Sequence, residues 1–148
     1  MKISTKGRYA LRLMIDLAEH DQGEFIPLKE IAARQEVSIK YMEQIVNQLS
    51  RAGLLRSVRG AQGGYRLTRL PEEYTAGEIL RVTEGGLAPI ACLDVAAEAC
   101  PRNQECSTLD FWVGLAEVVN QYVDGTTLAD LVLDHQKKLA EGAQNSNL

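Results

Sequence analysis

Apolar residues in the first third of the chain recur at helical spacing in three short stretches. The stretches predict helices over residues 5–20, 28–35 and 38–52. Ser38 is suited to cap the third helix at its N-terminus, and Gly53 is suited to end it. The inward positions of this third helix are Tyr41 or Met42, Ile45, Val46 and Leu49. Two helices joined by a short turn, the second of them capped, are typical of a helix-turn-helix, which we expect over residues 28–52.

The pattern then changes from helical spacing to alternation. Residues 54–59 and 65–69 alternate as strands do, and the glycine-rich stretch 60–64 between them needs positive φ. A basic hairpin that follows a recognition helix is typical of a wing. We therefore expect a mainly α fold with a small β-hairpin, in which residues 1–84 form a winged helix-turn-helix domain.

The second half of the chain predicts a loop between helices. A capping box at Thr75 and Glu78 starts a short helix that ends near Thr83. A polar, turn-rich loop covers residues 85–107, dimerisation and C-terminal helices cover 108–140, and residues 141–148 are expected to be disordered. The first of these helices carries a broad apolar stripe: Phe111, Trp112, Leu115, Val118, Val119, Tyr122 and Val123. The stripe is either ordinary core or, as we expect from its width, a subunit interface.

Charge separates the two halves. The net charge of −4 combines a basic segment 1–70, with 12 Lys or Arg against 7 Asp or Glu, and an acidic segment 71–148, with 4 against 13. A basic head on an acidic body indicates a head that approaches phosphate. The chain has no run of 18 apolar residues and no secretory signal pattern, so we expect a cytoplasmic protein without a membrane span.

The exposed face of the third helix offers candidate DNA contacts. Glu43 and Gln44 are either solvent-facing or, as we prefer, base readers: glutamine can pair with adenine, and glutamate can accept from cytosine N4. Ser38 is first a cap and second a phosphate contact. Tyr41 is expected to be half-buried with its hydroxyl near a phosphate, and Lys40 to add nonspecific affinity.

The predicted wing offers a second set of contacts. Arg59 lies beside the glycine tip, and an arginine there can enter the minor groove, where it senses groove width and negative potential. Gly60 and Gly63 shape the tip and let its backbone approach DNA. These three residues complete the predicted DNA-binding set.

The three cysteines of the chain all lie in the predicted loop. Cys92, Cys100 and Cys106 are spaced by seven and five residues. Thiolates gathered in one polar loop suit an iron–sulfur cluster or a thiophilic metal, and an odd number in a reducing compartment argues against a disulfide framework. The alternatives are redox sensing by the thiols without metal, and thiols with no role. His20 and His135 lie far from the loop in sequence and are expected to be surface residues.

Four segments carry a family resemblance. MKISTKGRYA at residues 1–10, YMEQI at 41–45, RGAQGGY at 59–65 and TAGEI at 75–79 resemble the IscR-like family of bacterial winged-helix regulators, over about residues 1–135. The resemblance implies a homodimer that binds pseudo-palindromic half-sites in double-stranded DNA through its two heads. It also implies that three cysteines before the long helix hold an iron–sulfur cluster.

The chain departs from the family pattern in its ligands. The first cysteine spacing is usually five residues rather than seven, Leu109 stands where IscR has a histidine ligand, and Arg8 lies where the nitric-oxide-sensing branch has an aspartate. The spacing of seven resembles the iron-responsive branch, which favours [4Fe-4S] over [2Fe-2S]. Candidates for the fourth ligand stay open: Asp94, Glu98, Glu105, Asp110, a small thiol or water.

These expectations combine into a functional hypothesis. We expect a dimeric transcription regulator, acting as a repressor, whose operator affinity is controlled by a cluster at Cys92, Cys100 and Cys106. One alternative is a metal-free regulator of cysteine metabolism that responds through its thiols or through a partner enzyme of cysteine biosynthesis. Another is an iron–sulfur carrier. No catalytic Ser/His/Asp set, carboxylate pair or phosphate-binding loop indicates an enzyme.

Overall fold

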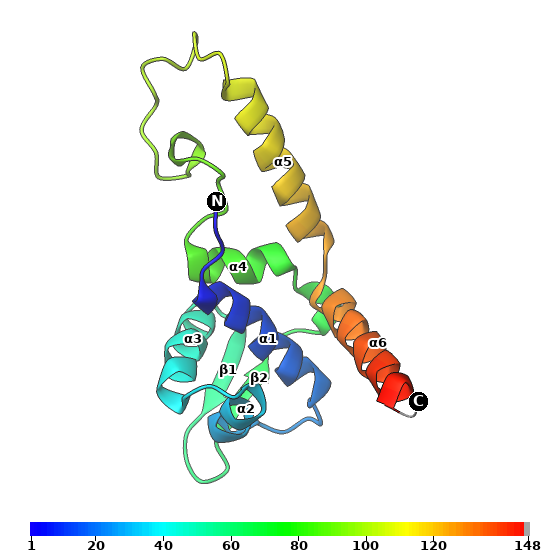
Figure 1. The fold of residues 1–148 in the computed structure, drawn as a ribbon. Helices are drawn as coiled ribbons and strands as arrows, with labels where there is room; N and C mark the ends of the chain where they lie inside the picture. The colour runs from blue at the N-terminus through cyan, green and yellow to red at the C-terminus, as the bar shows by residue number, and fades with distance from the viewer. Residues whose placement is uncertain (147–148) are drawn as a thin grey trace.

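A computed structural model describes residues 1–146 of the 148-residue chain, and Figure 1 shows its arrangement. The elements follow in the order α1 (Thr5–Glu19), α2 (Leu28–Gln35), α3 (Ile39–Arg51), β1 (Leu55–Val58), β2 (Gly64–Leu67), η1 (Pro71–Glu73), α4 (Ala76–Glu84), η2 (Ala91–Leu93), α5 (Leu109–Gly125) and α6 (Leu128–Ser146). The expected winged helix-turn-helix with a long helix behind it is confirmed.

The hydrophobic core lies in the head, where α1, α2 and α3 pack together with α4 and the hairpin. Its central side chains are fully or almost fully buried: Leu13, Met14, Leu17, Ile31, Met42, Ile45, Val46, Leu49, Tyr74 and Ile79. Apart from Tyr74, they are apolar positions of α1 to α4 at helical spacing, because one face of each amphipathic helix turns inward. The head thus buries its apolar stripes within one chain.

Tyr74 ties the hairpin to the rest of the head. Its side chain is fully buried, and its hydroxyl donates to the Leu54 carbonyl at 2.8 Å. The same oxygen accepts from the backbone N–H groups of Thr68 at 2.8 Å and Arg69 at 3.1 Å. A buried phenol with several partners fixes the position of the chain segments around it.

The wing is a two-stranded antiparallel sheet in which Leu55 lies opposite Leu67. Its second strand is also bonded to the segment before α2: Ile26 N–H donates to Tyr65 O at 3.0 Å, and Tyr65 N–H donates to Ile26 O at 2.9 Å. A Cβ at Gly64 would lie 2.2 Å from Ile26 O, so only glycine allows this approach. The wing is therefore anchored on one side to the helix-turn-helix.

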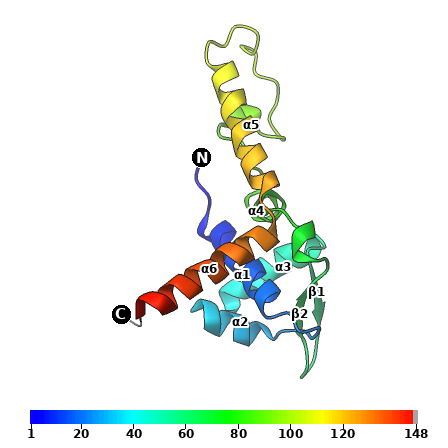
Figure 2. The ribbon, with the colours of Figure 1, turned by 90° about the vertical axis from the view of Figure 1, so that its right-hand side faces the viewer.

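The second half extends away from the head. In Figure 1, α5 projects above the head with the loop of residues 85–107 beside its upper end, and α6 continues downward from the lower end of α5 and packs on α1. Figure 2 shows the same separation from the side. The start of α6 is fixed by Leu128, which is fully buried and whose N–H donates to Tyr74 O at 3.0 Å.

The C-terminal helix is longer than its pattern predicts. We expected the C-terminal helices to end by residue 140 and residues 141–148 to be disordered, but α6 continues to Ser146. Good helix formers such as Leu139, Ala140 and Ala143 follow the packed first turns, and helix propagation from an existing nucleus is favourable. The expectation was wrong for residues 141–146, and residues 147–148 lie outside the described part. None of the helices described is both long and apolar enough to cross a membrane.

Candidate nucleic-acid interface and cysteine loop

The recognition helix α3 presents one polar face to solvent. Ser38 caps it, with its hydroxyl accepting from the N–H of Tyr41 at 3.1 Å. Lys40, Glu43 and Gln44 are exposed, whereas the opposite face of the helix is fully buried. The structure therefore leaves these three polar side chains free to reach a base edge or a phosphate.

Tyr41 lies at the border between the buried and exposed faces. Its ring is half-buried and meets the ring of Tyr9 edge-on, with centroids 5.8 Å apart. Arg12 stacks over the Tyr9 ring at 4.8 Å. The half-buried packing expected of Tyr41 is present, and it fixes the start of α3 against α1.

The wing ends in a tight, glycine-containing tip that begins at Arg59. Arg59, Gly60 and the neighbouring tip residues are exposed. Gly60 has φ +109°, and a Cβ at Gly63 would lie 2.3 Å from the Val58 carbonyl oxygen, so the tight tip requires both glycines. Burial raises the pKa of the Tyr65 hydroxyl, with Glu43 adding to the rise and Arg59 opposing it. Charges on α3 and on the wing therefore both act on the Tyr65 hydroxyl.

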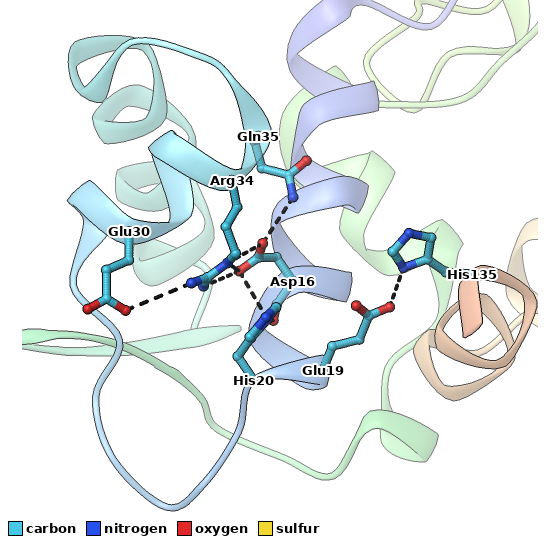
Figure 3. Close-up of polar contacts among 7 residues, drawn as sticks. All are labelled: Asp16, Glu19, His20, Glu30, Arg34, Gln35 and His135. Atoms are coloured by element: carbon cyan, nitrogen blue, oxygen red, sulfur yellow. Dashed lines mark hydrogen bonds and ion pairs between the residues drawn. The ribbon is translucent and has the colours of Figure 1, made fainter. Parts of the chain in front are cut away.

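A polar cluster that the sequence pattern did not reveal holds α2 against α1. Asp16 is the buried charged residue of the core, at 4% exposure. It accepts from Arg34 Nη2 at 2.7 Å and from Gln35 Nε2 at 3.0 Å (Figure 3). The hydrogen bond to Asp16 raises the pKa of Arg34. The available signal was an aspartate on the apolar face of α1, beside Leu13 and Leu17.

The two histidines take part in this same region. His20 Nδ1 lies 2.8 Å from the Asp16 carbonyl oxygen, and His135 of α6 contacts the Glu19 carboxylate (Figure 3). Both imidazoles are 44% exposed. They lie in the head and on α6, away from the cysteine loop.

The cysteine loop carries three free thiols on its outside. Cys92 and Cys106 are exposed and Cys100 is half-buried. Cys106 Sγ lies 3.7 Å from Thr108 Oγ1 just before α5. Hydrogen bonds from the Thr108 N–H and hydroxyl lower the pKa of the Cys106 thiol, whereas the nearby charge of Asp110 opposes that shift.

The loop supplies the right donor type but not a closed ligand set. Free thiols are the ligands that iron–sulfur clusters require. Within residues 1–146, however, no three His, Cys, Asp or Glu side chains are close enough to hold a metal ion together. The expected grouping of Cys92, Cys100 and Cys106 would therefore need the loop to close, and the expectation stays a prediction.

The helix α5 behind the loop has no fully buried residue. Phe111, Val118 and Tyr122 are 64%, 63% and 75% exposed. Part of the expected apolar stripe is thus exposed, whereas its other members, Trp112, Leu115, Val119 and Val123, are half-buried within the chain.

A capped recognition helix beside a basic, glycine-tipped hairpin defines a winged-helix DNA-binding protein. The model of the Rrf2 family, described as "Iron-dependent Transcriptional regulator", matches residues 3–134, and the chain belongs to this family. It is a DNA-binding transcription regulator, not an enzyme.

Known relatives cover nearly the whole chain. The HTH-type transcriptional regulator CymR of Bacillus subtilis is 43% identical over 132 residues, which are 88% of this chain and 89% of the relative. The HTH-type transcriptional regulator IscR of Aliivibrio salmonicida is 35% identical over 145 residues, 98% of this chain and 85% of the relative.

Solved structures show the same similarity. "The Structure of CymR (YrzC) the Global Cysteine Regulator of B. subtilis" superposes with a TM-score of 0.71 at 42% identity, covering 89% of this chain and 96% of that one. "T. potens IscR" gives a TM-score of 0.73 at 36% identity, covering 93% and 90%. The family resemblance seen in the sequence is thereby confirmed.

Proposed function

We propose that the chain is a dimeric repressor whose operator affinity is controlled by an iron–sulfur cluster held by Cys92, Cys100 and Cys106. The observation that carries the proposal is the position of three free thiols in one loop between α4, which packs on the head, and α5, which leaves part of its apolar face exposed. The similarity to proteins named IscR supports the same assignment.

The apolar face of α5 supplies the dimer contact. A helix that leaves Phe111, Val118 and Tyr122 in solvent needs a covering surface, and a second copy provides a self-complementary one. Two heads related by two-fold symmetry match a pseudo-palindromic operator. Figures 1 and 2 show α5 projecting beyond the head, where such a copy can reach it.

In each head, the polar face of α3 and the wing tip would contact the operator. Glu43 and Gln44 read base edges in the major groove, and Arg59 enters the minor groove at the wing. Lys40, Ser38 and the tip glycines contribute phosphate and backbone contacts. The exposure of these side chains, and the exposed turn that the tip glycines shape, support these roles.

The loop is linked to the head through the end of α4. Glu84, the last residue of α4, accepts from the Ser4 N–H at 3.2 Å and from the Ser4 hydroxyl, and Ser4 caps α1. A change in the order of the loop therefore acts at a residue that contacts the first helix of the head. A bound cluster would supply an oxidant-sensitive group. The chain itself supplies the thiolates that would hold it and the contact between Glu84 and Ser4 that connects the loop to the head.

The test is an anaerobic iron and sulfide assay with a visible spectrum, combined with operator binding before and after iron removal. In the wild type we expect visible absorbance together with bound iron and sulfide. Cys100→Ala should lose the absorbance, the iron and the sulfide. Removal of iron from the wild type should change its operator affinity. A colourless, iron-free wild-type protein purified without oxygen would contradict cluster control.

A second candidate is a metal-free thiol response. It is favoured by two observations: the cysteines are not gathered within residues 1–146, and Thr108 lowers the pKa of Cys106, which raises its thiolate fraction. A solved relative is named the global cysteine regulator of B. subtilis. An iron-free protein whose operator affinity responds to oxidant, and loses that response in Cys106→Ser, would support this candidate. A partner enzyme of cysteine biosynthesis stays a prediction within it.

A further inference from the structure

The long helix α5 is joined to the head by a small group of side chains on α4. Arg81 Nη1 lies 2.6 Å from Asp124 Oδ1, and Arg81 Nη2 lies 3.0 Å from Asp124 Oδ2. The same Nη2 donates to Asn120 Oδ1 at 2.8 Å. A guanidinium that grips a carboxylate with two parallel bonds fixes orientation as well as distance. We call these three residues the Arg81 clamp.

Gly77 lets the two helices approach at the clamp. A Cβ at this position would lie 2.2 Å from Asp124 Oδ1 and 2.9 Å from Val123 Cγ2. Any other residue would therefore displace the Asp124 carboxylate or the end of α5. The close approach and the bidentate contact occur at the same point.

The clamp is better suited to orient α5 than to stabilise the fold. The Arg81 and Asp124 side chains are 37% and 47% exposed, and ion pairs in such positions contribute little to the free energy of unfolding. Because α5 has no buried residue and packs mainly on α4, however, few other contacts determine its direction. Hydrogen bonds from Arg81 lower the pKa of Asp124, so the pair stays charged at neutral pH.

Because α5 is long, a small change in its angle at the Arg81 clamp moves its far end by a large distance. A helix of 17 residues is about 26 Å long at 1.5 Å per residue. A tilt of about 10° at one end moves the other by about 4 Å, which exceeds the rise of one base pair, about 3.4 Å. The angle held by Arg81 therefore has consequences on the scale of operator spacing.

We propose that Arg81 is a positioning residue: the clamp fixes the angle at which α5 leaves the head and so sets the half-site spacing that the dimer accepts. This inference rests on the proposed dimeric regulator. The clamp touches no DNA, and its effect is on the relative placement of the two heads.

The experiment compares operators that differ only in spacing. A paired operator is selected from random DNA with the full-length protein, and its centre is then lengthened or shortened by one and two base pairs. The variants are Arg81→Ala, the charge swap R81D/D124R, and the control Arg69→Ala, which removes the 2.7 Å ion pair with Glu78 on the same helix α4 but within the head.

The readout is the ratio of affinities between the selected and altered spacings. We expect about tenfold or more discrimination in the wild type and about threefold or less in Arg81→Ala, with an unchanged dimer mass. The charge swap should restore most of the discrimination. Arg69→Ala should keep the wild-type ratio, whatever its overall affinity.

Wild-type discrimination in a folded Arg81→Ala dimer overturns the inference and leaves the proposed function intact. If Arg81→Ala does not fold, Arg81→Lys decides the question, because it keeps the charge but loses the bidentate contact; an unchanged ratio there also overturns the inference. A wild-type protein that stays monomeric or selects only single half-sites overturns both proposals.

Discussion

The head and the helix α5 use similar apolar residues in opposite ways. In the head, side chains such as Leu13 and Ile45 are fully buried within one chain. In α5, Phe111 and Val118 stay more than half exposed. The head and the start of α6 therefore bury their apolar side chains within the chain, whereas α5 leaves part of its apolar face exposed. Buried apolar residues of the head are therefore expected to determine folding, and exposed apolar residues of α5 are expected to determine dimerisation.

The largest effect is expected for Leu13→Ala, which tests whether the buried core of the head stabilises the fold. Removing a fully buried leucine leaves a cavity, so we expect the free energy of unfolding to fall by about 2–5 kcal/mol. The matched control, Leu70→Ala, removes the same atoms from a side chain that is 66% exposed and should change it by less than about 0.5 kcal/mol. Urea denaturation of both variants measures the difference. Equal losses would contradict the placement of the core.

The converse test places a charge on α5. Val118→Asp should separate the dimer while the helical content of each chain is retained, because Val118 is 63% exposed and is not part of the head's core. We expect dimer affinity to fall about 100-fold or more, measured by analytical ultracentrifugation. Val95→Asp, at a loop position that is 97% exposed, is the control and should leave the mass unchanged. If Val118→Asp dimerised with wild-type affinity, α5 would not be part of the proposed interface.

A smaller effect is expected at the wing, where the head meets DNA. Arg59→Ala should weaken operator binding about tenfold and relax the preference for a narrow minor groove beneath the wing. Lys137→Ala removes the same charge from an exposed position on α6 and should have a much weaker effect. Binding titrations on the selected operator and on a variant with a wider groove test both points. If Arg59→Ala and Lys137→Ala changed operator binding equally, Arg59 would contribute only nonspecific electrostatic affinity.

The smallest expected effect concerns the joint between the two regions. The Arg81 guanidinium lowers the pKa of Asp124, so this pair favours the folded state above the unfolded pKa, and its contribution is lost as pH falls through the lower folded pKa. In Arg81→Ala the Asp124 midpoint should return upward toward the ordinary aspartate value. Carboxyl-detected NMR titration of both proteins measures this shift. Identical midpoints would mean that the pair does not persist in solution.

The sequence was informative where structure is local. The spacing of apolar residues in α1, α2 and α3 and the Thr75 capping box predicted these elements, because both signals lie within one or two turns of the helix concerned. The exposed polar face of α3 followed from the same periodicity. The pairing of Tyr65 with Ile26 did not follow, since it depends on how the wing packs on the segment before α2.

Contacts between distant segments were not predictable. Asp16 and Arg34 are 18 residues apart, and Arg81 and Asp124 are 43 apart, with no periodicity linking either pair. The polar composition near the C-terminus predicted disorder, but Glu141, Ala143 and Gln144 favour helix and extend α6 to Ser146. The cysteine spacing indicated donor chemistry, but the conformation of a loop with few internal contacts cannot be read from spacing alone.

The buried hydroxyl of Tyr74 limits what substitution can achieve at that position. One oxygen satisfies two backbone N–H groups and one carbonyl, from three residues that lie on both sides of the hairpin. Phenylalanine would keep the ring and its packing but leave these three backbone groups without that partner, and histidine would not reach all three. A side chain of similar size and hydrophobicity does not replace this one oxygen atom. The geometry of the wing therefore depends on a buried residue that DNA does not contact.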